Sequence, residues 1–264
     1  MVVGTTNSTF NKLHNNLLRS DSNLNSSIER ISSGKKITKA SDSPSELAVL
    51  AALQAQTRGI TQQINNGMSE ISMLQTAEGA LDSTSQSLQR MSELSVQAAN
   101  GTLTDNDRSA IMAEIKELSA GINKTASSTE FNNIKLLDGS LSVTLTGGRG
   151  FSQGAADVES LGLSNISVAN QADASKAIES VKSAIDMVSS YRSEIGATVN
   201  GINSEISNYQ TSLINTVSAQ SQIEDVDMAA EIINMNRDSL QSKFAIKAFD
   251  MQNVTASKVL NLLG

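Results

Sequence analysis

A heptad repeat that follows the chain's single proline constrains the fold more than any other sequence feature. Pro44 lies between Ser43 and Glu46, an arrangement that predicts a capped helix start with Pro44 in the first turn. Mostly apolar residues then recur every seven positions in two rows, as in a coiled-coil seam. The rows are Leu53, Ile60, Gly67, Leu74, Leu81 and Leu88, and Leu50, Thr57, Ile64 and Ile71. The pattern predicts one helix over about 44–100.

Such a helix cannot fit inside a compact molecule of this size. At about 1.5 Å per residue, residues 44–100 would span roughly 85 Å. A globular chain of 264 residues would have a diameter of about 45–50 Å. Aromatic residues make up 3% of the chain and apolar residues 39%, which suits thin helical seams. The sequence therefore predicts an elongated rod.

The remaining elements follow from caps and periodicity. Thr104 and the acidic residues after it resemble a second helix cap, and apolar spacings of four and three predict a helix over about 105–127. Two heptad rows predict a third long helix over about 172–220. Between these, 131–170 is rich in glycine and asparagine, and apolar residues alternate over 141–145. We therefore expect a mainly α fold, an elongated helical rod of long antiparallel coiled-coil helices with a small central β-hairpin region.

Both chain ends carry helical apolar rows that cannot hold a fold alone. Residues 223–254 have about eight large apolar side chains, whose burial yields about 12–16 kcal/mol. Ordering roughly forty residues costs on the order of 40 kcal/mol. We therefore expect both ends to be largely disordered in the monomer and to order on assembly with other copies. The expected polymerisation seam is Leu13, Leu17, Leu24, Ile31, Ile223, Ile233, Leu240, Phe244, Met251 and Val254.

Composition argues against several function classes. The net charge is −7 and the longest basic cluster, Lys35-Lys36 with Lys39, is short, so we expect no nucleic-acid binding. No apolar run reaches the roughly 18–20 residues that a membrane span needs, so we expect no membrane insertion. Cysteine is absent, as suits an exported chain. The first residues lack a basic region followed by an apolar one, which predicts export without a cleaved signal peptide.

No residue set predicts catalysis or a cofactor. His14 is the only histidine, and there is no cysteine for a nucleophilic site. Gly34-Lys35 lacks the leading glycine and the following Ser or Thr of a phosphate-binding loop. Glu224, Asp225 and Asp227 lack the spacing of a calcium loop, and negative charge near a helix start explains them. We expect no catalytic, cofactor-binding or metal-binding residues, and no enzyme.

Several blocks of sequence resemble bacterial flagellin. Near the N-terminus these are residues 28–37, the Ala-Ser-Asp of 40–42, residues 76–81 and residues 88–100. Near the C-terminus they are residues 221–231 and 259–263. The resemblance spans roughly 1–138 and 172–264, in the order the family has. The chain resembles a short flagellin that lacks large outer domains.

The resemblance implies a domain organisation and a function. Residues 1–42 and 221–264 would pair as terminal helices in the inner core of an extracellular flagellar filament, and 43–220 would form a rod domain around it. The subunit would polymerise with other copies for swimming motility. Its partners would be an export chaperone bound to the C-terminal segment, the filament cap and hook-associated proteins. Small or polar seam members such as Gly67 suggest sliding between packing states as a basis for filament supercoiling.

Three residues carry a further implication of the resemblance. Arg90, Leu94 and Glu114 match the pattern of the flagellin patch that the flagellin-sensing Toll-like receptor binds. The alternative interpretation is that they make subunit contacts. Receptor binding would require an animal host.

Two other function classes remain open at this point. A flagellar hook-filament junction protein shares these terminal blocks, and abundance in sheared filaments would distinguish the two. A chemoreceptor-like signalling coiled coil also has long heptads, and Gln62-Gln63 resembles its methylation pair. The glycine-rich centre and the absence of apolar spans argue against the receptor, and a small enzyme ranks third.

Overall fold

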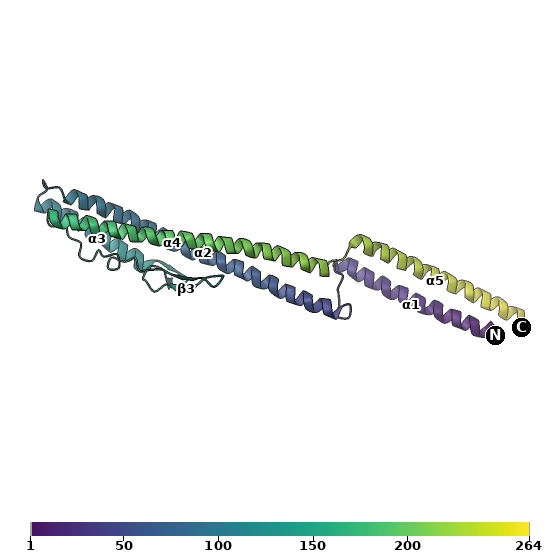
Figure 1. Cartoon of the computed structure of the whole chain (residues 1–264). Coiled ribbons are helices and arrows are strands. Elements are labelled where there is room, and N and C mark those ends of the chain that lie inside the picture. Colours follow the sequence, from purple (N-terminus) through teal and green to yellow (C-terminus); the bar gives the residue numbers. More distant parts are fainter. Residues whose placement is uncertain (1, 264) are drawn as a thin grey trace. The chain divides into compact units, whose positions relative to one another are not determined.

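The computed structural model describes the backbone of residues 2–263 and the side chains of residues 10–255, 257 and 258. Within that part of the chain there are five α-helices and two small antiparallel strand pairs (Figure 1). The helices are α1 (Val2–Ser33), α2 (Pro44–Ala98), α3 (Asp105–Ser128), α4 (Gln171–Glu224) and α5 (Met228–Leu263). The prediction of a mainly α fold with long helices is confirmed.

The chain divides into two compact units. We call residues 1–58 with 214–264 the terminal unit, and residues 59–213 the central unit. The limits that the resemblance implies for the filament, at 42/43 and 220/221, stay a prediction. α2 begins beside the first of these limits and α4 continues through the second. The limits between the terminal unit and the central unit lie inside the same two helices.

The helix starts follow the predicted local signals. Pro44 is the first residue of α2, and its missing N–H costs nothing there because first-turn N–H groups have no helical partner. Thr104 caps α3 with a full capping box. Its hydroxyl accepts from Asp107 N at 3.3 Å, and Asp107 Oδ2 accepts from Thr104 N at 2.9 Å. The predicted boundaries of α2 and α3 agree with the structure to within two residues, while α4 runs four residues beyond its predicted end.

The apolar core of the central unit confirms the predicted heptad rows. On α2, Leu74, Leu81 and Leu88 are fully buried. α3 and α4 add further buried side chains to the same cluster, namely Ile111, Ile115, Ile122, Val181, Val188, Ile195 and Ile202. Each such side chain contributes about 1.5–3 kcal/mol on burial, so the heptad rows supply the cohesion of this unit.

Two hairpins lie between α3 and α4. β3 (Ser142–Thr144) pairs with β4 (Gly150–Ser152), with Val143 opposite Phe151. This is the predicted hairpin, and Gly147 and Gly148 take the positive φ values that its turn needs, 84° and 78°. The sequence pattern did not separate out the other hairpin, β1 (Glu130–Phe131) with β2 (Ile134–Lys135). Asn132 and Asn133 form its turn at φ 48° and 63°, values that asparagine tolerates.

In the terminal unit, α1 and α5 lie side by side, with the two chain ends at the same end of the pair (Figure 1). The two helices are therefore antiparallel in this unit. Within the described residues, no helix is long and apolar enough to cross a membrane.

Candidate assembly surface

The seam between α1 and α5 is unusually polar. On α1 the predicted seam residues Leu13, Leu17, Leu24 and Ile31 are half-buried. The α5 residues that are buried in this pair are Glu231, Asp238, Ser242 and Ala245. Because a heptad seam normally buries large apolar side chains, this helix pair lacks most of the apolar burial that would hold it together.

Hydrogen bonds and ion pairs join the two helices along this seam. Arg30 Nη1 lies 3.4 Å from Glu231 Oε1, and Ser242 donates from Oγ to Asp21 Oδ1 at 2.9 Å. Near the chain ends, the rings of Phe10 and Phe249 lie 4.5 Å apart. Polar pairs fix the register of two helices more than they stabilise the helix pair.

The predicted α5 seam residues are largely exposed. Their exposed fractions are 68% for Ile233, 53% for Leu240, 70% for Phe244, 72% for Met251 and 53% for Val254. We call these five residues the outer face of α5. Ile223, at the end of α4, is half-buried. Exposed large apolar side chains gathered on one helix indicate an interaction surface.

A hollow beside the outer face runs between the two helices. It has a volume of about 530 Å³, and its lining includes Leu13 and Arg19 of α1 with Phe244 and Ala248 of α5. Its walls mix the apolar carbon of these residues with the Arg19 guanidinium and with the polar side chains of Asn16, Asn23 and Gln241.

The segment that follows α1 is joined to the end of α4 and the residues after it by a small backbone ladder. Lys36 N donates to Glu224 O at 2.6 Å, and Val226 N donates to Gly34 O at 3.1 Å. Gly34 adopts φ 71°, which a side chain would disfavour. The Lys35 ammonium pairs with the Glu224 carboxylate. The Gly34-Lys35 sequence is thus a helix-ending turn, as its mismatch with a phosphate loop indicated.

Two buried carboxyls in this unit are held in the charged form. The hydrogen bond from Lys35, with a smaller one from Gln220, lowers the pKa of Glu224. The hydrogen bond from Ser27 lowers the pKa of Glu231, and Asn234 and Arg30 add to the effect. Sequence reasoning missed this role, although the seven-residue spacing of Glu224, Glu231 and Asp238 was available to show it. Asp227 has the predicted role at a helix start, because its Oδ1 accepts from Ala229 N and Ala230 N.

The three receptor-binding candidates do not share one surface. Arg90 and Glu114 are exposed and joined, with Arg90 Nη2 2.8 Å from Glu114 Oε1. Arg90 also pairs with Glu93 at 3.1 Å. Leu94 is 2% exposed and belongs to the core of the central unit. The burial of Leu94 therefore separates it from the exposed pair of Arg90 and Glu114.

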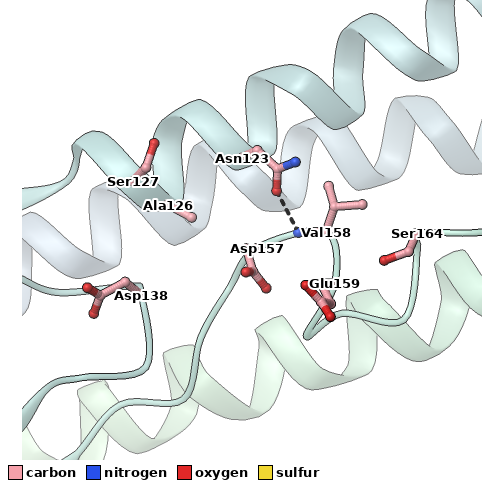
Figure 2. A pocket seen from close by; sticks show the side chains of 8 residues that line it. All are labelled: Asn123, Ala126, Ser127, Asp138, Asp157, Val158, Glu159 and Ser164. Carbon is pink, nitrogen blue, oxygen red and sulfur yellow. Dashed lines mark hydrogen bonds between the residues drawn. The ribbon is translucent and has the colours of Figure 1, made fainter.

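A hollow of the central unit that Asp138, Asp157 and Glu159 help to line offers no converging catalytic set. It measures about 600 Å³, and Figure 2 shows Asp138 set apart from Asp157 and Glu159. Asp138 Oδ1 accepts hydrogen bonds from Ser140 N and Ser140 Oγ. Asn123 Oδ1 accepts a hydrogen bond from Val158 N at 2.9 Å. Across the described side chains, no group of three or more His, Cys, Asp or Glu residues could hold a metal ion.

Long paired helices with an apolar face left open define a structural subunit. Comparison with known proteins gives the same class. The bacterial flagellin N-terminal helical region matches residues 5–142, and the bacterial flagellin C-terminal helical region matches residues 178–263. The chain therefore belongs to the bacterial flagellin family, whose members are structural subunits of the flagellar filament.

Individual relatives match over nearly their whole length. The chain is 30% identical to flagellin of Listeria monocytogenes over 270 residues, covering 94% of each protein. It is 34% identical to flagellin of Halalkalibacterium halodurans over 245 residues, covering 89% of this chain and 90% of that protein. The crystal structure of Bacillus cereus flagellin matches with a TM-score of 0.50 and 27% identity, over 55% of this chain and 88% of that one. These matches support a filament subunit over the junction-protein and chemoreceptor-like alternatives.

Proposed function

We propose that this flagellin polymerises by burying the outer face of α5 and the seam residues of α1 against other copies of the chain. The observation that carries the proposal is the reversal on α5, where carboxylates face α1 and large apolar residues face outward. Covering the outer face stabilises the assembly by roughly 1.5–3 kcal/mol per side chain. The terminal helices 1–42 and 221–264 then form the inner core, and 43–220 forms the surrounding rod domain.

The polar seam also suits export. A helix pair with little apolar burial is marginal in an isolated chain, so the ends stay disordered until neighbours cover them. The outer face would be the part of the C-terminal segment that an export chaperone binds beforehand. Filament cap and hook-associated proteins would meet the same terminal helices at the ends of the filament, outside the cell.

A pair of substitutions on α5 tests the assembly proposal. Phe244→Ser removes a ring that is 70% exposed, and Ser242→Ala, two residues away, alters the face toward α1. Seeded growth should fail or slow strongly for Phe244→Ser and proceed for Ser242→Ala, as seen by electron microscopy and sedimentation. Normal fibres from Phe244→Ser, or from a chain lacking residues 1–40 and 224–264, would contradict the proposal.

A second function is favoured by the exposed ion pair of Arg90 with Glu114. We propose that this pair lies in a surface that the flagellin-sensing Toll-like receptor of a host binds. Arg90→Glu reverses the charge beside Glu93 and Glu114 and should abolish receptor signalling by the soluble monomer. The double change Arg90→Glu with Glu114→Arg restores the pair in reverse and separates lost folding from lost recognition. Undiminished signalling by Arg90→Glu would remove the proposal.

A further inference from the structure

The sequence contains three Asn-Gly pairs, at residues 66–67, 100–101 and 200–201. An Asn-Gly pair is the sequence most open to spontaneous deamidation, because glycine leaves the following peptide nitrogen unhindered. All three asparagines are exposed. Exposure therefore does not distinguish them, and backbone conformation does.

Two of the pairs lie inside long helices. Asn66-Gly67 is in the middle of α2 and Asn200-Gly201 is in the middle of α4. In an α-helix the glycine N–H donates to the carbonyl four residues earlier, and the peptide cannot turn its nitrogen toward the preceding side chain. Reaction at either pair requires a local opening of the helix.

Asn100-Gly101 lies outside any helix, in the turn between the end of α2 and the start of α3. Asn100 Oδ1 accepts from Thr102 N at 3.1 Å and from Thr102 Oγ1 at 3.0 Å. A side-chain oxygen bonded to the N–H two residues on bends the carboxamide over the peptide in between, which is that of Gly101. The attacking nitrogen and the target carbon are thus held together by the turn.

The same two hydrogen bonds favour the reaction electronically. Donors aimed at a carbonyl oxygen stabilise the negative charge that develops there when a nucleophile adds. Thr102 N and Thr102 Oγ1 are so placed at Asn100 Oδ1. The turn supplies both proximity and a small oxyanion site.

We propose that Asn100 is a site of spontaneous modification, at which the folded chain forms a succinimide and then aspartate or isoaspartate. Hydroxide removes the proton of Gly101 N, and this nitrogen attacks Asn100 Cγ. The N–Cγ bond forms, the Cγ–Nδ2 bond breaks, and ammonia leaves with a proton from water. Water then opens the ring at either carbonyl, which leaves one more negative charge on the chain.

The modification would disturb a partly buried contact. Asn100 O accepts from Arg108 Nη2 at 3.1 Å, and isoaspartate inserts an additional carbon into the main chain at this residue. The former Asn100 carbonyl becomes a free carboxylate outside the main chain, and the turn that placed it beside the guanidinium is changed. The product should therefore be less stable in the central unit than the starting chain.

The test is incubation of the full-length folded protein in warm, mildly alkaline buffer, with peptide mapping by mass spectrometry over time. Asn100 should deamidate at least about tenfold faster than Asn66 and Asn200, because only the helical sites must first open. Equal or slower reaction at Asn100 would overturn the proposal.

Gly101→Ala is the matched variant, because an added Cβ there meets no atom within 4 Å and φ is not positive. The variant should fold normally, as circular dichroism would show, and should lose most of the reaction at Asn100 with the two helical sites unchanged. Thr102→Val, made separately, removes one donor to Asn100 Oδ1 and should also slow the reaction relative to the unmodified chain. Reaction at Asn100 that persists at full rate in Gly101→Ala would contradict the proposed succinimide route.

Discussion

Arg108 of α3 donates from its guanidinium Nη1 to the main-chain carbonyl of Ala98, the last residue of α2. Nη2 of the same side chain donates to Asn100 O at 3.1 Å and Leu103 O at 3.4 Å. Arg108 is 7% exposed. One buried side chain thereby satisfies carbonyls along the whole turn from α2 to α3, where helix-end carbonyls lack a helical partner.

Arg108→Met should lower the free energy of unfolding by about 2–3 kcal/mol, because it removes the guanidinium donor from the buried carbonyl of Ala98 and from the partly buried carbonyls of Asn100 and Leu103. Urea denaturation followed by circular dichroism would measure the loss. Arg90→Met is the control, since it removes only exposed ion pairs, which contribute little. Equal midpoints for the two variants would contradict the capping role of Arg108.

Two glycines of α2 should respond in opposite ways to a side chain. A Cβ at Gly79 meets nothing within 4 Å, so Gly79→Ala should stabilise the chain by about 0.5–1 kcal/mol through helix propensity. A Cβ at Gly67 would lie 3.1 Å from Ile206 Cγ1, so Gly67→Leu should cost about 1–3 kcal/mol by overpacking.

Thermal unfolding compares the two glycine variants directly. The same Gly67→Leu chain, co-polymerised with the unmodified chain, should also change filament waveform under the light microscope. A waveform identical to that of Gly79→Ala filaments would show that close approach at Gly67 has no part in supercoiling.

The backbone ladder of the terminal unit should weaken in acid. The pKa of Glu224 is lowered below its ordinary value of 4.5, first by the hydrogen bond from Lys35. A carboxyl with a lowered folded-state pKa contributes stability above its unfolded pKa and loses that contribution as the pH falls through the folded value. The hydrogen-exchange protection factors of residues 30–36 and 221–231, which correct for the intrinsic slowing of exchange in acid, should therefore fall below about pH 4.5.

Glu224→Gln is the matched test of this acid response. It should exchange faster at neutral pH and show a smaller change on acidification, whereas Glu93→Gln, at an exposed residue of the central unit, should behave like the unmodified chain. An unchanged acid response in Glu224→Gln would assign the effect to other groups.

Asp238 should respond to an apolar replacement with a gain in helix. It is 4% exposed, and Arg237 Nε of its own helix lies 3.4 Å from Oδ1. Replacing a buried ion pair by apolar residues is often stabilising, by about 1–4 kcal/mol, and here the partner Arg237 is 60% exposed, so the loss of Asp238 leaves no buried charge unpaired. Asp238→Leu should therefore raise the far-ultraviolet helix signal of the soluble monomer. Asp250→Leu, at an exposed position of the same helix, is the control, and equal signals from both would argue against the polar seam as the cause of marginal pairing.

Much of the helical fold was predictable because its signals are local. Pro44 and Thr104 fix two helix starts through their own backbone and side-chain chemistry. The heptad rows of α2 could be interpreted directly, because the central unit buries them within one chain. The β1–β2 turn at Asn132 and Asn133 was missed because each of its strands has only two residues, too few to show an alternating pattern.

The candidate surfaces were harder to predict. A periodic apolar row does not say whether it faces the same chain or another one, and on α5 the row that includes Phe244 faces outward. Leu94 illustrates the reverse error, since a motif shared with a surface patch includes a side chain that packs inward. Tertiary packing decides both cases, and no short stretch of sequence contains it.

The ladder that joins Gly34 and Lys36 to Glu224 and Val226 closes the intervening chain into a loop. The entropy of closing such a loop changes only slowly with its length. Residues could therefore be inserted or deleted between β3 and α4 during evolution with little change in the stability of the backbone ladder. The exposed surface of the filament could therefore change during evolution while the contacts between subunits stay the same.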